Sequence, residues 1–363
     1  MSAMPEIVRI EGRGPVAMAL ALFLARQGFD AASIVLDPVP SVLPDWLASR
    51  SLALSLGSWQ LLSRVAALPP AAPISKVEVS LRGRAGRTRI QASDLGAPAL
   101  GYVLRYGPLH RALAAAIEAR PAPARPASVE GTPAATLAVI ADGDPGAGSQ
   151  VRDFDQTALL AEVVAERDGH GIAFERFTDE GPLALLPLPE AHRHALVWCA
   201  RPAESERRAA LDAPAFEAEL LAAFGRALGS LKLDGARLLA PLQRRVRAHD
   251  RDAQRIAIGN AAQALHPVAG QGLNLGLRDA FELARQLGEL RATNQPLGEA
   301  VARFRRARRA DRGLTVAVTD TLAQAFTVPS IARIESLALG ALDLIAPARD
   351  GLAAALMFGL RTR

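Results

Sequence analysis

The sequence predicts an α/β protein in which a parallel, nucleotide-binding type of sheet is combined with an antiparallel sheet and a helical C-terminal region. Three observations predict this class. Residues 7–37 follow the order strand, glycine turn, helix and strand. Residues 255–289 pass from a short apolar strand through a glycine-rich turn into an amphipathic helix. Residues 156–199 alternate apolar positions with Gly and Pro turns, which is typical of antiparallel strands.

The N-terminal unit has the layout of a Rossmann-like dinucleotide-binding fold. A short β-branched strand is followed by Gly12, Gly14 and Ala17 in a G-x-G-x-x-A pattern that opens a helix. Alanine at the third position still permits close packing of helix on strand. The second strand ends at Asp37, 25 positions after Gly12, where a carboxylate meets the adenosine ribose of a dinucleotide. We therefore expect Gly12, Gly14, Ala17 and Asp37 to bind a cofactor.

The glycine-rich run near the C-terminal end of the sheet predicts a second contact with that cofactor. Gly270, Gly272 and Gly276 lie just before and inside the start of a helix that we expect over residues 277–289. Glycines let backbone N–H groups approach a ligand closely, and a helix N-terminus carries partial positive charge. This arrangement suits a group that becomes anionic, such as the N1–C2=O edge of a reduced flavin.

The same run resembles the second flavin-binding motif of the aromatic-ring hydroxylases, the single-component FAD monooxygenases. The segment Gly259-Asn260-Ala261-Ala262-Gln263 precedes His266-Pro267-Val268-Ala269-Gly270-Gln271-Gly272-Leu273-Asn274. Asn260 and Gln263 resemble the branch that hydroxylates 2-polyprenyl-6-methoxyphenol in ubiquinone biosynthesis. The resemblance implies that FAD is bound by a set of residues in this run: Gly259, Asn260, Gly270, Gln271, Gly272, Leu273 and Asn274.

The resemblance implies roles for five further residues. Arg50 corresponds to an arginine that reaches the FAD phosphates or ribityl chain, with a surface arginine as the alternative. Arg105 precedes a helix whose start lies against the adenine-side phosphates. Asp142 belongs to an Asp-Gly pair that contacts the FAD ribose and is associated with reductant binding. His266 would hydrogen-bond near substrate or flavin, or else rigidify its loop, and Pro267 would pack on the ring edge near the O2 site.

The implied reaction is insertion of oxygen into the ring of a polyprenylated phenol. NAD(P)H or another donor would reduce FAD, and O2 would then give the flavin C4a-hydroperoxide that transfers oxygen. Other proteins of ubiquinone biosynthesis are expected as partners. Because the resemblance lapses over residues 121–150, where related hydroxylases have two or three more strands, a competing hypothesis stays open. In that hypothesis the chain is a non-catalytic or weakly FAD-binding paralogue that serves as a structural subunit of a ubiquinone-biosynthesis complex.

The pattern predicts a discontinuous domain arrangement. We expect the FAD-binding domain to comprise residues 1–73, 101–150 and 240–300. Residues 74–100 and 151–239 would form the substrate domain, and residues 301–363 a helical C-terminal region.

Composition and charge narrow the remaining classes of function. The formal net charge is +5, and six arginines gather between Arg303 and Arg312, which predicts a solvated helix face or a weak attraction to anionic lipid. We find no nucleic-acid motif and no zinc-ligand spacing, so we expect no metal. The single cysteine, Cys199, fits a reducing cytoplasm and a buried structural thiol. The apolar stretches are too short to span a bilayer, so we expect a cytoplasmic bacterial protein whose membrane contact, if any, is peripheral.

Overall fold

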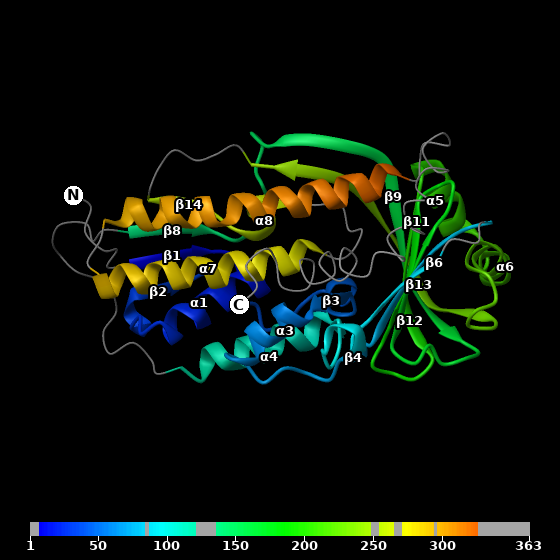
Figure 1. Ribbon diagram of the computed structural model, residues 1–363, viewed down its shortest axis with the longest axis horizontal. Helices are drawn as coiled ribbons and strands as arrows, with labels where there is room; N and C mark the ends of the chain where they lie inside the picture. Colours follow the sequence, from blue (N-terminus) through cyan, green and yellow to red (C-terminus); the bar gives the residue numbers. More distant parts are fainter. Residues whose placement is uncertain are drawn as a thin grey trace.

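The computed structural model describes residues 7–83, 87–120, 136–247, 254–264, 271–293 and 296–325. Within them, a parallel sheet at one end of the elongated molecule is joined to a large, mostly antiparallel sheet at the other end (Figure 1). The predicted fold class is confirmed. No helix of the described residues is long and apolar enough to cross a membrane.

The parallel sheet forms the core of the expected FAD-binding domain. Its described strands have the order β14-β8-β1-β2, and every neighbouring pair is parallel. Helix α1 lies between this sheet and the later helices, so it is apolar on all sides and almost fully buried from Ala17 to Leu24. The elements of this layer are β1 (Ile7–Glu11), α1 (Pro15–Arg26), β2 (Ile34–Leu36), β8 (Thr136–Ile140), β14 (Arg255–Ala257), α7 (Gln271–Thr293) and α8 (Leu297–Ala325).

A small antiparallel sheet lies between the two ends of the molecule. It has the order β3-β7-β4, and the helices Leu56–Ser63 and Tyr106–Glu118 pack against it. Ser55 caps the helix that begins at Leu56 by accepting a hydrogen bond from the Ser58 N–H. The elements are α2 (Asp45–Ala48), β3 (Ser51–Ser55), α3 (Leu56–Ser63), β4 (Ala72–Ile74), β7 (Gly101–Arg105) and α4 (Tyr106–Glu118).

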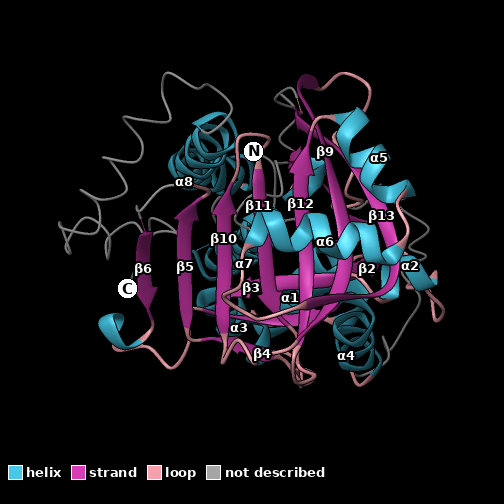
Figure 2. Cartoon of the chain, turned by 90° about the vertical axis from the view of Figure 1, so that its right-hand side faces the viewer, coloured by secondary structure: helices cyan, strands magenta, loops and turns pink. Residues whose placement is uncertain are grey.

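The large sheet carries the expected substrate domain. Its described strands have the order β15-β13-β9-β12-β11-β10-β5-β6, and only β10 and β5 pair in parallel. Helices α5 and α6 cover one face of it, as Figure 2 shows. The elements are β5 (Lys76–Leu81), β6 (Arg87–Gln91), β9 (Gln150–Ala165), β10 (Ile172–Phe177), β11 (Pro182–Pro187), β12 (Arg193–Ala200), α5 (Pro202–Ala210), α6 (Ala213–Phe224), β13 (Leu231–Val246) and β15 (Gln263–Ala264). Among the described residues, short 3-10 helices cover Ala31–Ser33, Ser93–Leu95 and Gly259–Ala261.

Three expected boundaries need correction. The boundary at residue 240 falls inside β13, because this strand pairs with β9 on both sides of that point, with a register shift between Pro241 and Gln243, up to Val246 opposite Gln150. The boundary at residue 301 falls inside α8, which already begins at Leu297. The helix expected from residue 277 begins at Gln271, because its first turns pack against the protein through the buried residues Asn274 and Leu275, which offsets the low helix propensity of the glycines. The remaining domain assignment stays a prediction.

Candidate flavin-binding site

Four of the predicted cofactor residues meet at one edge of the parallel sheet. Gly12 and Asp37 directly follow β1 and β2, while Asp142 and Gly259 lie two residues after β8 and β14. Parallel strands in one sheet end at the same edge, and ligands of open α/β sheets bind outside the carboxyl ends of the strands. Residues that are up to 247 positions apart in the sequence are thereby brought to one side of the sheet.

The turn after β1 admits only glycine at its first position. Gly12 has a φ of +139°, and a Cβ atom placed on it would lie 2.4 Å from the carbonyl oxygen of Ala141. The Gly12 N–H donates a hydrogen bond of 2.9 Å to Oδ2 of Asp37. Asp37 therefore fixes this turn as well as standing where a ribose is expected. Ala17, one turn into α1, is fully buried, as its predicted packing role requires.

The N-terminus of α1 fits an anionic group. Gly14 is the residue that precedes the helix. Among the described residues, no side chain caps the N–H groups of the first turn of α1, and this turn contains no acidic residue. The phenolic oxygen of Tyr106 bounds the space here, 3.7 Å from the position of a Cβ on Gly14. These N–H groups are available to a pyrophosphate.

Arg50 lies on the same side of the sheet. Its side chain is exposed, and its carbonyl oxygen accepts a hydrogen bond of 2.8 Å from the Tyr106 N–H. Burial raises the pKa of the Tyr106 phenol, and the positive charge of Arg50 opposes that rise. The phosphate or ribityl contact of Arg50 remains a prediction that its position permits.

A pocket of about 250 Å³ lies between α2 and α4, beside this turn. His110, whose backbone partner is Arg13, forms part of its wall. Burial lowers the pKa of His110, which disfavours the charged form of the imidazole, and the backbone hydrogen bond with Arg13 opposes this shift. Tyr106 and His110 carry no sequence motif, and only the packing of α4 against the N-terminal turn identifies them.

Gly259 and Gly276 make a close contact that sets the distance between β14, α7 and α1. Gly259 has a φ of +58°. A Cβ atom on Gly276 would lie 2.7 Å from Val16 Cγ2 and 3.0 Å from the Gly259 Cα. The expectation that Gly276 leaves room for a ligand is therefore wrong, since its missing side chain makes room for protein.

Two predicted residues at the start of α7, Gly272 and Asn274, have contacts with other parts of the protein, and Asn274 is hydrogen-bonded to the backbone of β3. The buried amide of Asn274 accepts from the Ser55 N–H at 2.8 Å and donates to the Ala53 carbonyl oxygen at 3.0 Å. Gly272 faces the loop after β14, where its Cβ position is 3.3 Å from Oδ1 of Asn260. Asn274 thus positions α7 on the small sheet, and its contact with FAD stays a prediction.

The other residues of this run are placed as follows. Gln271 is buried, Leu273 is half-buried against the core of the parallel layer, and Asn260 is exposed. The catalytic candidates His266 and Pro267, together with Gly270, lie outside the described residues. Their roles stay predictions.

Arg105 is directed to the large sheet, and its predicted phosphate contact is not supported. Its guanidinium forms a bidentate ion pair with the carboxylate of Glu162 on β9. Its Nη2 also lies 3.5 Å from Oε2 of Glu190. It also donates to the carbonyl oxygen of Ser49 at 3.2 Å. The hydrogen bond to Glu162 raises the pKa of Arg105 against the effect of burial. The reason is topological, because β7 ends beside β9 of the other sheet, which local sequence does not reveal.

Part of the arginine cluster is internal, so neither predicted surface role applies to it. Asp279 is fully buried in α7, and its carboxylate accepts from Arg308 Nε at 2.6 Å and from Arg312 Nη2 at 2.9 Å. Oδ2 of Asp279 also accepts from the Gly259 N–H at 3.1 Å. Helix α8 is thereby connected through one carboxylate to the loop expected to contact flavin.

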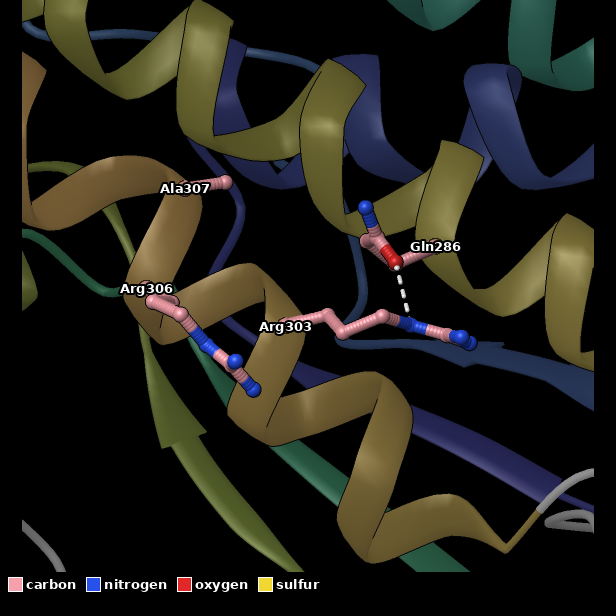
Figure 3. Close-up of a pocket in the computed structure, with 4 residues that line it drawn as sticks. All are labelled: Gln286, Arg303, Arg306 and Ala307. Carbon is pink, nitrogen blue, oxygen red and sulfur yellow. Dashed lines mark hydrogen bonds between the residues drawn. The ribbon is translucent and has the colours of Figure 1, made fainter.

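A second pocket, of about 260 Å³, lies farther along α7 and α8 (Figure 3). Arg303 donates to Oε1 of Gln286 at 3.1 Å there, and Arg306 and Ala307 complete the lining. Gln286 is about four helical turns from the start of α7. This pocket is therefore separate from the sheet edge where the cofactor residues meet.

Comparisons with known proteins relate the chain to FAD-binding hydroxylases. A family profile described as "FAD binding domain" matches residues 143–308. The chain is 29% identical to the ubiquinone hydroxylase UbiL of Rhodospirillum rubrum, over 94% of this chain and 86% of that protein. It is 28% identical to the 3-demethoxyubiquinol 3-hydroxylase of Escherichia coli, over 80% of this chain and 83% of that protein.

Solved structures show the same fold. The p-nitrophenol 4-monooxygenase PnpA of Pseudomonas putida superposes with a TM-score of 0.69, covering 100% of both chains at 15% identity. HpxO of Klebsiella pneumoniae, complexed with FAD and uric acid, gives a TM-score of 0.68 over 98% of this chain and 97% of that chain, at 12% identity. At these identities the likeness concerns the fold alone.

Proposed function

Because the chain belongs with the FAD-dependent monooxygenases related to the hydroxylases of ubiquinone biosynthesis, we propose that it hydroxylates the ring of 2-polyprenyl-6-methoxyphenol. The observation that carries the proposal is the meeting of Gly12, Asp37, Asp142 and Gly259 at the carboxyl edge of one parallel sheet. The choice among phenolic substrates rests on the Asn260 and Gln263 variants of the flavin motif.

The described residues suit the parts of FAD. The free N–H groups at the start of α1 would hold the pyrophosphate, and Asp37 would accept hydrogen bonds from the adenosine ribose. Asp142, whose Oδ1 already accepts from the Asp144 N–H, would contact the FAD ribose and take part in reductant binding. The N-terminus of α7, beginning at Gln271, would stabilise negative charge at the pyrimidine edge of the flavin.

The protein would contribute to catalysis mainly through the shape of the substrate site. Bound FAD would supply the reduction of O2 and the oxygen transfer, with NAD(P)H as the proposed reductant. The large sheet would supply an apolar wall that excludes water and orients the phenol ring. The polyprenyl tail must come from a membrane or a partner protein, so we propose peripheral contact with one of them.

Two experiments test the proposal. The first is an absorbance spectrum after FAD titration and desalting, in which near-stoichiometric flavin is expected. The second is complementation of strains blocked at each ring-hydroxylation step, with identification of the accumulated quinone precursor. Rescue of a different step would refute the assigned ring position, and rescue of none would refute the hydroxylase function.

A non-catalytic structural role remains the competing proposal. It is favoured by the sequence, because only residues 119–135 lie between the end of α4 at Glu118 and the start of β8 at Thr136. Related hydroxylases have two or three more strands in this part of the chain. Absence of a flavin band at any FAD concentration would favour this role.

A further inference from the structure

Glu175 lies on the face of the large sheet that points toward the FAD-binding domain. On β10, Phe174 points to the opposite face, where its ring packs against Phe224 of α6 at a centroid distance of 5.4 Å. Ala173, two residues before Glu175 and therefore on its face, packs with Val103 of the small sheet. Side chains alternate along a strand, so Glu175 shares the orientation of Ala173.

The side chains nearest to Glu175 in its row are apolar, and the polar Thr88 on β6 lies in register beyond Val79. In register with it across the sheet are Val79 on β5 and Ala184 on β11, followed by Val197 on β12 and Leu160 on β9. Within the described residues, its carboxylate has no hydrogen bond and no ion pair. An unpaired carboxylate in apolar surroundings is costly, and such a group commonly has a functional use.

Other ionisable groups on this face do not neutralise it. Cys199 lies in the next row on β12, where burial raises the pKa of its thiol and the nearby charge of Glu175 raises it further. Glu162, in the row on the other side, is paired with Arg105. The side chain of Glu175 is nevertheless half-buried, so a small molecule lying on the sheet can reach it.

We propose that Glu175 binds the phenol hydroxyl group of the substrate and takes up its proton. The inference rests on the proposed function and names a residue for it. The O–H bond of the phenol breaks, its electron pair stays on the phenol oxygen, and the proton forms an O–H bond on the carboxylate. The resulting phenolate donates electron density into the ring that must attack oxygen. After the transfer, the ring carbon that has gained oxygen releases its own proton to solvent, which restores aromaticity, and the proton on the carboxylate returns to the phenol oxygen.

The acid–base properties of Glu175 suit this step. Burial raises its pKa to about 7, so the carboxylate is ionised in a large share of molecules at neutral pH and is also basic enough to accept a proton. Below this pH the group is protonated and no longer accepts.

The test compares Glu175→Gln with wild type as FAD-loaded proteins, using 2-methoxyphenol as a soluble probe beside the prenylated substrate. We expect kcat/KM to fall by about 100-fold, a typical contribution of general base catalysis. We also expect the wild-type rate to rise through pH 7, and this inflection to disappear in the variant. Glu175→Asp keeps a carboxylate, so it should recover part of the rate together with the inflection.

Glu78→Gln is the matched control. Glu78 lies on the adjacent strand β5, on the opposite face, where it pairs with Arg87 and Arg89. It should leave kcat/KM and the pH profile unchanged. Flavin content, measured for every variant, separates loss of fold from loss of chemistry.

The outcomes distinguish the two proposals. If wild type hydroxylates and Glu175→Gln keeps its rate and pH profile, the inference about Glu175 is overturned and the hydroxylase function stands. If wild type hydroxylates no phenol, the proposed function fails, and the pH dependence of 2-methoxyphenol binding then decides the role of Glu175. If 2-methoxyphenol binding has the same pH dependence in wild type and in Glu175→Gln, the proposed role of Glu175 is overturned. If the inflection near pH 7 is lost in the variant, that role is supported.

Discussion

Replacing Asp279 with Asn removes one negative charge from a buried cluster between α7 and α8. The carboxylate is fully buried and accepts three hydrogen bonds, from Arg308 at 2.6 Å, from Arg312 at 2.9 Å and from the Gly259 N–H at 3.1 Å. Arg308 also pairs with Asp311, but Arg312 has no second carboxylate among the described ion pairs. The substitution therefore leaves a guanidinium without its counter-charge.

The size of the effect follows from this burial. Breaking a buried ion pair by removing one partner costs about 3–5 kcal/mol, because the other charge stays desolvated. The Arg312 side chain is 19% exposed, so water reaches it in part. We therefore expect the free energy of unfolding to fall by about 3 kcal/mol, at the lower end of the range.

Urea unfolding of the apoprotein measures this loss directly. Burial acts to raise the pKa of Asp279, but Arg312 and Arg308 outweigh it and hold the pKa below its ordinary value. The stabilisation is thus complete above the ordinary pKa of an aspartate and is lost only as the pH falls through the lowered value. The difference between variant and wild type should consequently be the same at pH 6 and pH 8.

Asp311→Asn is the control for the bond to Gly259. It removes the same charge from the same cluster, in which Asp311 pairs with Arg278 and Arg308, without touching the loop. Both variants should be destabilised, but only Asp279→Asn should also weaken FAD affinity at a temperature where both are folded. A loss of less than about 1 kcal/mol for Asp279→Asn, with an unchanged m-value, would refute the reasoning.

Three further substitutions test the site. Gly12→Ala would place a methyl group 2.4 Å from the Ala141 carbonyl oxygen at a φ of +139°. We therefore expect thermal unfolding to show about 1–3 kcal/mol of destabilisation and FAD to stabilise the variant no longer. An unchanged melting temperature in the presence of FAD would contradict this. Gly272→Val brings a branched side chain against Asn260, so flavin retention should fall while far-UV circular dichroism stays near wild type, and unchanged retention would mean that the loop is misplaced. For Glu175, the raised pKa of about 7 means that wild type loses stability as the pH rises from the ordinary glutamate value to 7. The free energy of unfolding of Glu175→Gln relative to wild type should therefore be larger at pH 8 than at pH 5, by up to about 3 kcal/mol. Solvent that reaches the half-buried carboxylate makes this difference smaller. An equal difference from wild type at both pH values would disprove the raised pKa.

The parts of the fold that are determined by residues close together in the sequence could be predicted. Glycine spacing, apolar periodicity and a carboxylate 25 positions after Gly12 are local signals, and they correctly indicate the β1-α1-β2 unit and the strand ends that carry Asp37. The partners of Arg105 could not be predicted, because they lie 57 and 85 positions away on another sheet. Glu175 is likewise a single acid in an apolar strand, and only the pairing of that strand shows which face it is on.

The position of α1 has a consequence for the way the chain folds during synthesis. This helix is apolar on every side, and α7, which packs against it, ends at Thr293. Strand β14, which closes one edge of the same sheet, is also made late. A nascent chain that has just completed α4 therefore displays an uncovered apolar helix beside an incomplete sheet until residues 255–293 have left the ribosome. Contacts of such sequence separation form slowly, and we expect the emerging N-terminal half to need a chaperone until they do.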